Sequence, residues 1–127
     1  MFVSLLLDTS VLIRGHADPL DKVAISAVSV AELHFGVLVA ADDEARANRL
    51  QRLATIERVF DPLPFDGTVA RECGRLHAAV VQRGGRPRRR AFDLAIAATA
   101  NVHQVPLLTH DPADFKLIDD LVEIRTP

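Results

Sequence analysis

The chain has 127 residues, of which 49% are hydrophobic and 25% are charged, and its formal net charge at pH 7 is −2. This length suffices for one core, so we expect a single domain over residues 1–127. No apolar run reaches membrane-spanning length, no basic segment precedes the first apolar run, and the lone Cys73 excludes an internal disulfide and a cysteine-based zinc cluster. We therefore expect a cytoplasmic protein without a membrane association, in which Cys73 lies in the core.

The first half of the chain alternates short apolar runs with segments of helical periodicity. In chain order these are a strand at 3–7, a short helix from 8 through 13, a strand at 23–26, a helix from 29 to about 41, and a helix that begins at the acidic run 42–44. The helix starts carry aspartate or serine, whose side-chain oxygens can accept from the first free backbone N–H groups.

The second half continues the alternation. Its expected elements are an edge strand or extended connector at 59–65, a helix from Asp66 to about Gln82 that ends before Gly84-Gly85, an alanine-rich helix at 93–103, and strands at 105–109 and 121–124. Pro62 and Pro64 exclude a central strand from the connector. Strands separated by helices are typical of parallel sheets, so we predict an α/β fold, a three-layer α/β/α sandwich around a central parallel sheet.

Four carboxylates lie at the ends of apolar segments or beside small residues. They are Asp8, Glu32, Asp93 and Asp111. An unpaired buried carboxylate is costly, and no lysine or arginine is placed to pair locally with any of the four. Ligands of parallel α/β sheets bind beyond the carboxyl ends of the strands, where Asp8 and Asp111 are expected. We therefore predict a site for a divalent cation such as Mg²⁺, which prefers oxygen ligands.

Each acid also has a purely structural interpretation. Asp8 and Asp93 could cap the helices that follow them, and Asp111 could begin a turn with Pro112. Glu32 completes an S-x-x-E capping box that starts at Ser29. Helix caps at one end of a parallel sheet also converge on one cleft, so capping and metal binding can be two roles of the same residues.

Thirteen of the fifteen basic residues are arginine, and five of them precede Asp93 within eight positions, namely Arg83, Arg86, Arg88, Arg89 and Arg90. Such a run is often only a solvated loop. Its place beside a predicted metal ligand favours contact with phosphate, since guanidinium groups match phosphate oxygens well. The five histidines have no partner at metal-ligand spacing, so we interpret them as structural or surface residues.

Four segments in order carry a family resemblance. They are Leu5-Leu6-Leu7-Asp8-Thr9-Ser10-Val11-Leu12-Ile13, Ile25-Ser26 with Val30-Ala31-Glu32-Leu33, Phe92-Asp93-Leu94-Ala95-Ile96-Ala97-Ala98-Thr99-Ala100, and Leu108-Thr109-His110-Asp111-Pro112-Ala113-Asp114-Phe115. The chain resembles the PIN-domain ribonucleases from Val3 to Val122. Within that family it is most similar to the VapC toxins of bacterial type II toxin–antitoxin pairs.

The resemblance implies a role for each matching position. Asp8, Glu32 and Asp93 match the acids of the family's magnesium site, Asp111 matches a fourth position that is Asp or Asn in relatives, and Asp114 matches a further acid of varying role. Ser10 and Thr109 match hydroxyls that hold the acids in place. The implied activity is a Mg²⁺-dependent (or Mn²⁺-dependent) endoribonuclease that leaves a 3′-hydroxyl and a 5′-phosphate.

The resemblance also implies partners, namely an RNA substrate, a second copy in a homodimer, and a VapB-type antitoxin that lies along the hairpin of the second and third helices. We assign Arg86, Arg88, Arg89 and Arg90 to the RNA backbone as a hypothesis from their position. Two alternatives stay open, a different metal-dependent phosphotransfer enzyme and a non-catalytic protein-interaction module. Ser10 stands where an aspartyl-phosphate phosphatase would need a second acid, which weighs against the first alternative.

Overall fold

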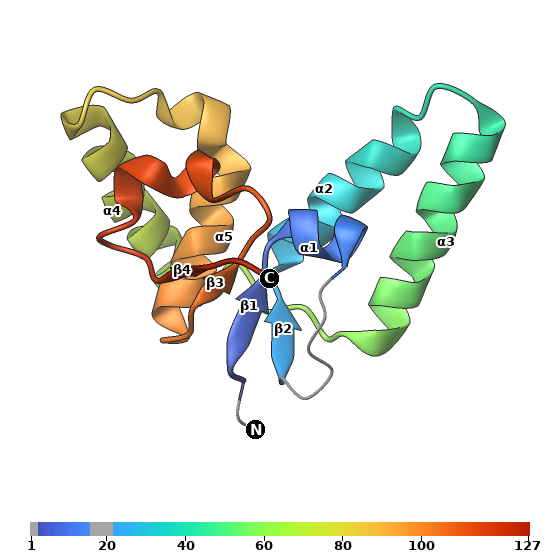
Figure 1. Ribbon diagram of the computed structural model, residues 1–127, viewed down its shortest axis with the longest axis horizontal. Helices are drawn as coiled ribbons and strands as arrows, with labels where there is room; N and C mark the ends of the chain where they lie inside the picture. The colour runs from blue at the N-terminus through green and yellow to red at the C-terminus, as the bar shows by residue number, and fades with distance from the viewer. Residues whose placement is uncertain (1–2, 16–21) are drawn as a thin grey trace.

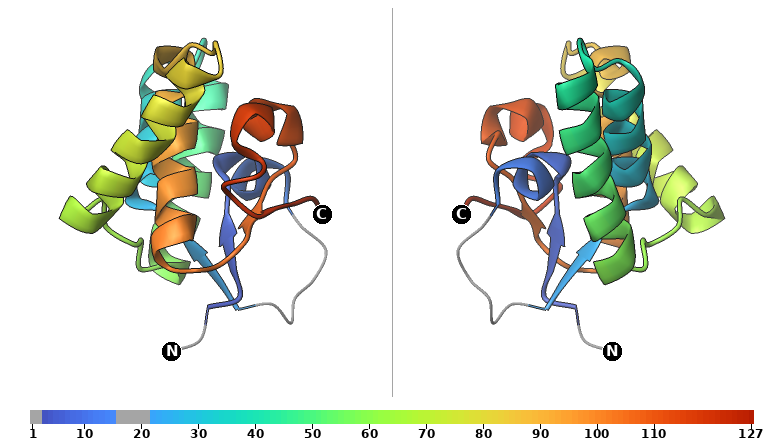
Figure 2. Two further views of the ribbon diagram at one scale, coloured as in Figure 1. Left: turned by 90° about the vertical axis from the view of Figure 1, so that its left-hand side faces the viewer. Right: turned by 90° about the vertical axis from the view of Figure 1, so that its right-hand side faces the viewer.

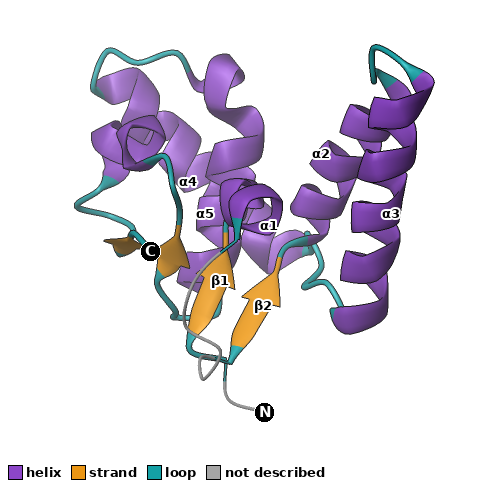
Figure 3. Ribbon diagram, turned by 45° about the vertical axis from the view of Figure 1, so that its right-hand side comes forward, coloured by secondary structure: helices purple, strands orange, loops and turns teal. Residues whose placement is uncertain are grey.

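The computed structural model describes residues 3–15 and 22–127. Within these residues the centre of the fold is a sheet of four parallel strands in the order β2-β1-β3-β4 (Figure 3). The strands are β1 (Leu5–Leu7), β2 (Val23–Ile25), β3 (Leu107–Leu108) and β4 (Ile124–Arg125). Leu6 of the central strand β1 pairs with Ala24 on one side and with Leu107 on the other. Because all strands run the same way, their carboxyl ends meet at one edge of the sheet.

Helices connect the strands. They are α1 (Thr9–Arg14), α2 (Ala27–Leu38), α3 (Asp43–Val59), α4 (Gly67–Gln82) and α5 (Ala91–Val102), with the short 3₁₀ helices η1 (Pro87–Arg90) and η2 (Pro112–Ile118). Figure 1 shows the α2–α3 hairpin and the α4–α5 pair as two arms that rise on either side of α1, beyond the carboxyl ends of β1 and β2. Figure 2 shows the two arms from their outer sides. Helix α1 lies between the arms and directly follows the carboxyl end of β1, the edge of the sheet where a site is expected.

Alternation along β1 divides the core into two parts, because successive side chains of a strand point to opposite faces of the sheet. Leu6 packs into a cluster with residues of α4, α5 and η2. Leu5 and Leu7 pack into a second cluster with residues of α1, α2 and α3. The predicted three-layer α/β/α sandwich around a parallel sheet is therefore confirmed.

The α4–α5 arm has the tightest packing. Val69, Cys73, Leu76 and Val80 recur at helical spacing along the buried face of α4, so Cys73 lies in the core as expected. Every residue of α5 from Leu94 to Ala100 is buried, and its alanines let α4 approach closely. None of the described helices is both long and apolar enough to cross a bilayer.

Two helices begin earlier than predicted, which corrects two of the capping interpretations. α2 starts at Ala27, because Ser26 is its N-cap and accepts a hydrogen bond from the Val28 N–H. Ser29 is buried inside the helix, so the predicted capping box with Glu32 is wrong. α5 starts at Ala91, directly after η1, so Asp93 lies in its first turn and is not its cap.

The other boundaries are closer to expectation. Asp42 and Asp66 cap α3 and α4 through hydrogen bonds from Ala45 and Val69, as predicted. Val59 still belongs to α3, and the rest of the predicted connector, 60–65, is extended, with a bridge between Leu63 and Ser26. β3 is shorter than the run 105–109 that predicted it, and the strand predicted at 121–124 is misplaced, because β4 shares only Ile124 with it. The arginine run and the segment after Asp111 form 3₁₀ helices where a loop and a turn were expected.

Candidate active site

All four predicted acids lie on one recess of about 220 Å³ at the carboxyl ends of the strands. Its lining residues are Asp8, Thr9, Ser10, Ile13, Glu32, Asp93, Asp111 and Asp114. They come from five places in the chain: the end of β1, helix α1, helix α2, the first turn of α5 and the segment after β3. The parallel topology thus brings together residues more than 100 positions apart.

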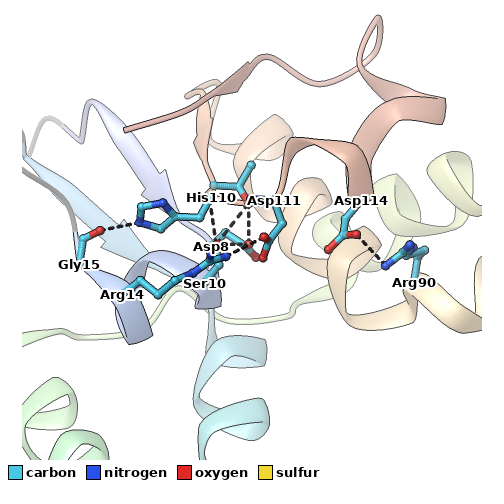
Figure 4. A network of polar contacts seen from close by, with 9 residues as sticks. Asp8, Ser10, Arg14, Gly15, Arg90, His110, Asp111 and Asp114 are labelled. Atoms are coloured by element: carbon cyan, nitrogen blue, oxygen red, sulfur yellow. Dashed lines mark hydrogen bonds and ion pairs between the residues drawn. The ribbon is translucent and has the colours of Figure 1, made fainter.

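Asp8 is held by two hydroxyl groups from different segments. Ser10 Oγ and Thr109 Oγ1 each donate to Asp8 Oδ2, both at 2.8 Å. Ser10 also accepts from the backbone N–H of His110 at 3.0 Å, which fixes the position of its hydroxyl group (Figure 4). Asp8 occupies the N-cap position of α1 but makes no side-chain capping bond, so the capping interpretation of its carboxylate is wrong. Its side chain is instead oriented by the hydroxyl groups of Ser10 and Thr109, the two residues predicted to hold the acids in place.

Glu32 is held by a residue that sequence reasoning did not single out. Thr9 Oγ1 donates to Glu32 Oε1 at 2.7 Å. Thr9 Oγ1 also lies 2.9 Å from Ser29 Oγ. Burial raises the pKa of Glu32 above its ordinary value, the hydrogen bond from Thr9 opposes that rise, and the charge of Asp8 adds to it. The only signal for Thr9 was its place between Asp8 and Ser10, where a second hydroxyl is available.

Asp93 has the most perturbed titration in the site. Burial is the largest cause, and repulsion from Asp8, Asp114 and Glu32 adds to it, so that the pKa of Asp93 rises to about 7. Arg90 acts in the opposite direction, with its Nη1 atom 3.8 Å from Asp93 Oδ2. Without a cation, a good part of the Asp93 population is therefore protonated at neutral pH.

Two arginines flank the acids. Arg14 Nη2 donates to Asp111 Oδ1 at 2.6 Å, and Arg90 Nη1 lies 3.0 Å from Asp114 Oδ1 (Figure 4). The expectation that no arginine is placed to pair locally with the four acids is wrong for Asp93, because Arg90 lies three positions before it on the chain. Arg14 is separated from Asp111 by 97 positions, so that pairing is not local and was not visible in the sequence.

Asp111 precedes η2 but makes no side-chain capping bond to it. Its backbone carbonyl accepts from the Asp114 N–H at 3.0 Å, so the segment does turn here, as one interpretation held. Its backbone N–H donates to Thr109 Oγ1 at 3.0 Å. The carboxylate itself is turned to Arg14 and is available to exchange that partner for another cation.

The donor set fits a hard cation, although the acids are spread apart. Carboxylate and hydroxyl oxygens line the recess, as Mg²⁺ prefers, and the raised pKa of Asp93 reports negative charge that a cation would offset. Among residues 3–15 and 22–127, no three acidic, histidine or cysteine side chains are close enough to enclose one ion. Two of the acids on the recess, Asp111 and Asp114, are instead paired with Arg14 and Arg90.

The arginine run adjoins the acids. Arg88, Arg89 and Arg90 line a recess of about 240 Å³ together with Glu32, Phe92 and Asp93. All three arginines are exposed. Arg86 does not line this recess and lies instead on a neighbouring one, which Arg89 and Arg90 share.

The histidines play the structural part expected of them where they are described. The His110 ring nitrogen Nε2 lies 2.7 Å from the Gly15 carbonyl oxygen, a contact that ties the end of α1 to the segment after β3 (Figure 4). His34 and His103 are exposed, and His77 is partly buried on α4. His16 lies outside the described residues.

Comparison with known proteins bears on this site. The PIN domain family matches residues 5–121. "Ribonuclease VapC5" of Mycobacterium tuberculosis is 41% identical over 107 residues, 83% of this chain and 75% of that protein. "Ribonuclease VapC4" of the same organism is 37% identical over 129 residues, 95% of each chain.

Solved structures agree. The VapBC-5 toxin–antitoxin structure from M. tuberculosis matches with a TM-score of 0.78 and 35% identity, over 98% of this chain and 97% of that one. FitAcB from Neisseria gonorrhoeae matches with a TM-score of 0.73 and 28% identity, over 94% and 95% of the two chains. The chain therefore belongs to the PIN-domain family and, within it, to the VapC ribonucleases.

Proposed function

We propose that the protein is a Mg²⁺-dependent endoribonuclease toxin whose acidic recess holds the metal. The observation that carries this proposal is the convergence of Asp8, Glu32, Asp93 and Asp111 on one recess, where the pKa of Asp93 is raised to about 7. Such a shift at a cluster of acids in a cleft is typical of a functional site. Mn²⁺ has similar ligand preferences and is expected to substitute for Mg²⁺.

The chain's own residues would then act by holding and positioning. Asp8, Glu32, Asp93 and Asp111 would hold the metal, with Ser10 and Thr109 fixing Asp8 and Thr9 fixing Glu32. When bound, the metal would supply an acidified water and stabilise negative charge on the phosphoryl oxygens. No histidine lines the recess among the described residues, so the acids and the metal would carry out the proton chemistry.

The direct test is cleavage of a structured RNA by the purified protein. We expect cleavage with Mg²⁺, none with EDTA in excess, and recovery when Mg²⁺ or Mn²⁺ is restored. The products should carry a 5′-phosphate, which makes them substrates for a 5′-phosphate-dependent exonuclease without prior kinase treatment. Cleavage that persists in EDTA would refute a metal-dependent mechanism.

We propose that the arginine run binds the RNA backbone. Replacing Arg88, Arg89 and Arg90 by glutamine is expected to weaken RNA binding and to lower the slope of log K against log salt by up to about 2, since each phosphate contact contributes about 0.7 for single strands. Binding should be measured in the Asp93→Asn background, so that the RNA stays intact.

A matched control removes the same charge elsewhere. Arg46, Arg58 and Arg71 are exposed arginines that line none of the recesses described above. Their triple replacement by glutamine should lower the salt slope much less. Equal slopes for the two triple variants would assign the effect to net charge and would remove the arginine run from the RNA site.

We further propose an antitoxin partner and a homodimer. The structural relatives are described as VapBC toxin–antitoxin complexes, and the α2–α3 hairpin here exposes a set of large apolar side chains. These are Phe35, Leu38, Val39 and Leu50. Exposed apolar side chains gathered on one arm are typical of a protein-binding surface, which supports the hairpin as the antitoxin contact.

A further inference from the structure

A second recess, of about 260 Å³, lies between η1 and η2, beside the acids. It shares Arg90 with the recess of the arginine run and Asp114 with the acidic recess, so it adjoins the candidate active site. Its walls differ in chemistry from the acidic recess. Val80, Leu94, Leu117 and Ile118 make the apolar part, and Arg86 and Arg89 supply the positive charge.

The walls of this recess are held in place by specific contacts. Arg83 Nη1 donates to the Leu117 carbonyl oxygen and to Asp120 Oδ1, both at 2.6 Å, and its second nitrogen donates to Asp120 Oδ2 at 3.0 Å. This fork joins the end of α4 to η2. On the other side, the Arg90–Asp114 ion pair joins η1 to η2. These contacts fasten η2 to the end of α4 and to η1, which fixes the two walls relative to each other.

Gly84 and Gly85 form the turn between α4 and the arginine run, where the backbone passes close to Val80 and Leu117. Gly84 has φ +81°, which a residue with a side chain rarely adopts, so the turn here favours glycine. A Cβ atom on Gly85 would lie 2.4 Å from Leu117 Cδ1 and 2.7 Å from Val80 Cγ1. Any side chain at position 85 would displace Leu117 or Val80, so glycine lets these two lining side chains keep their positions.

A ligand for this recess needs an apolar, flat body and nearby negative charge. Aliphatic walls accept the body, and guanidinium planes both stack on flat rings and bind phosphate. A nucleotide of single-stranded RNA has both properties. The protein has no Trp or Tyr and only six Phe, so aliphatic side chains and arginines must provide most contacts with bases.

We propose that the recess between η1 and η2 binds the base of a nucleotide that neighbours the cleaved phosphodiester. The inference rests on the proposed ribonuclease function, because it is the shared Arg90 and Asp114 that place this nucleotide next to the acids. Arg86 and Arg89 contact the nucleotide, whereas Arg88, which does not line this recess, contacts backbone outside it. Base preference at one position of the substrate is set here.

The first test needs no cleavage. The ¹⁵N-labelled protein is titrated in EDTA with the four nucleoside 5′-monophosphates, with ribose 5-phosphate as the probe that lacks a base, and with a short peptide that carries leucine and glutamate. We expect at least one nucleotide to shift the amide signals of Gly85 and Leu117 and to bind several-fold tighter than ribose 5-phosphate. Equal binding of nucleotide and ribose 5-phosphate, or shifts with the peptide alone, would overturn the proposal.

Paired variants sharpen this test. Leu117 is 42% exposed, so Leu117→Asn is expected to fold and to weaken nucleotide binding about three- to tenfold through lost apolar contact, with ribose 5-phosphate unaffected. Val59→Asn alters an exposed apolar residue at the end of α3 that lines none of the recesses, and it should leave nucleotide binding unchanged. Arg86→Gln should weaken nucleotide binding more than Arg88→Gln, although both remove one charge.

A cleavage experiment separates this inference from the ribonuclease proposal. An RNA that wild type cuts is prepared with single abasic sites on either side of the cut. One abasic position should slow wild type several-fold and slow Leu117→Asn by much less. If wild type cuts the RNA and every abasic site affects both proteins alike, the base site is refuted while the ribonuclease function stands. If the protein cuts no RNA at all, both proposals fail.

Discussion

Asp93→Asn is expected to lower RNA cleavage by about 10²–10³-fold or more, the scale on which loss of one preorganised charge-stabilising group is felt. The substitution keeps the shape of the side chain and removes the charge that would hold the metal. Asp93 would share the metal with Asp8, Asp111 and Glu32 on the acidic recess, and a neutral amide or a water molecule would not restore the lost negative charge. Cleavage rates should be compared at saturating RNA and several Mg²⁺ concentrations.

A matched control separates lost chemistry from lost structure. Asp61 is an exposed aspartate in the connector before α4, and Asp61→Asn should cut RNA at the wild-type rate. Asp93→Asn should fold at least as well as wild type, because it relieves repulsion from Asp8, Glu32 and Asp114. An Asp93→Asn protein that is folded and fully active would remove Asp93 from the metal site.

The second large effect concerns stability and pH in the absence of metal. The folded protein raises the pKa of Asp93 from 3.8 to about 7, so between these values the folded state keeps a proton that the unfolded state has lost. Stability falls with rising pH wherever the unfolded state binds fewer protons, so this group destabilises the fold increasingly from pH 4 to 7. Asparagine at position 93 cannot ionise and escapes this loss.

We therefore expect the Tm of Asp93→Asn to exceed that of wild type in EDTA by an amount that grows from pH 5 to pH 8 and then levels off. A difference of at least about 4 °C at pH 8 corresponds to roughly 1 kcal/mol in a domain of this size. Other titrations largely cancel between the two proteins, and Asp61→Asn should follow wild type. A Tm difference that is constant with pH, or largest at pH 5, would contradict the electrostatic account of the recess.

Mg²⁺ should reduce this difference, because a cation bound to the folded state stabilises wild type by mass action and removes the repulsion. The same salt concentration as KCl should have a much smaller effect. The stability experiment thus reports on the acids independently of any RNA.

The fold was largely predictable because its signals are local. Short apolar runs that alternate with amphipathic helices predict a parallel sheet between helical layers, and Asp42 and Asp66 mark helix starts correctly. The start of α2 was misplaced because Ser26 and Ser29 are both plausible caps, and burial of Ser29, which decides between them, depends on tertiary packing. The 3₁₀ helices η1 and η2 were missed because such short segments have no clear periodicity.

The placement of the candidate site was predictable for a different reason. Acids that follow parallel strands must meet at the same edge of the sheet, so Asp8 and Asp111 were bound to be neighbours. Their hydrogen-bond and ion-pair partners were harder to predict. Arg14 reaches Asp111 only after the chain has folded, and Thr9 reaches Glu32 only because α1 packs against α2. The Arg83–Asp120 pair, which joins the end of α4 to the segment after η2, is likewise invisible in sequence.

The central claim is that the carboxylates of the acidic recess hold a divalent metal. The most direct test is to locate bound Mn²⁺ by measuring which amide NMR signals it broadens paramagnetically. The acidic run 42–44 at the start of α3 serves as an internal control, since it is an exposed cluster outside the recess. We predict that substoichiometric Mn²⁺ broadens Thr9, Glu32 and Asp93 first in wild type, and much less in Asp93→Asn. Broadening confined to residues 42–44, or equal broadening in the two proteins, would contradict the claim.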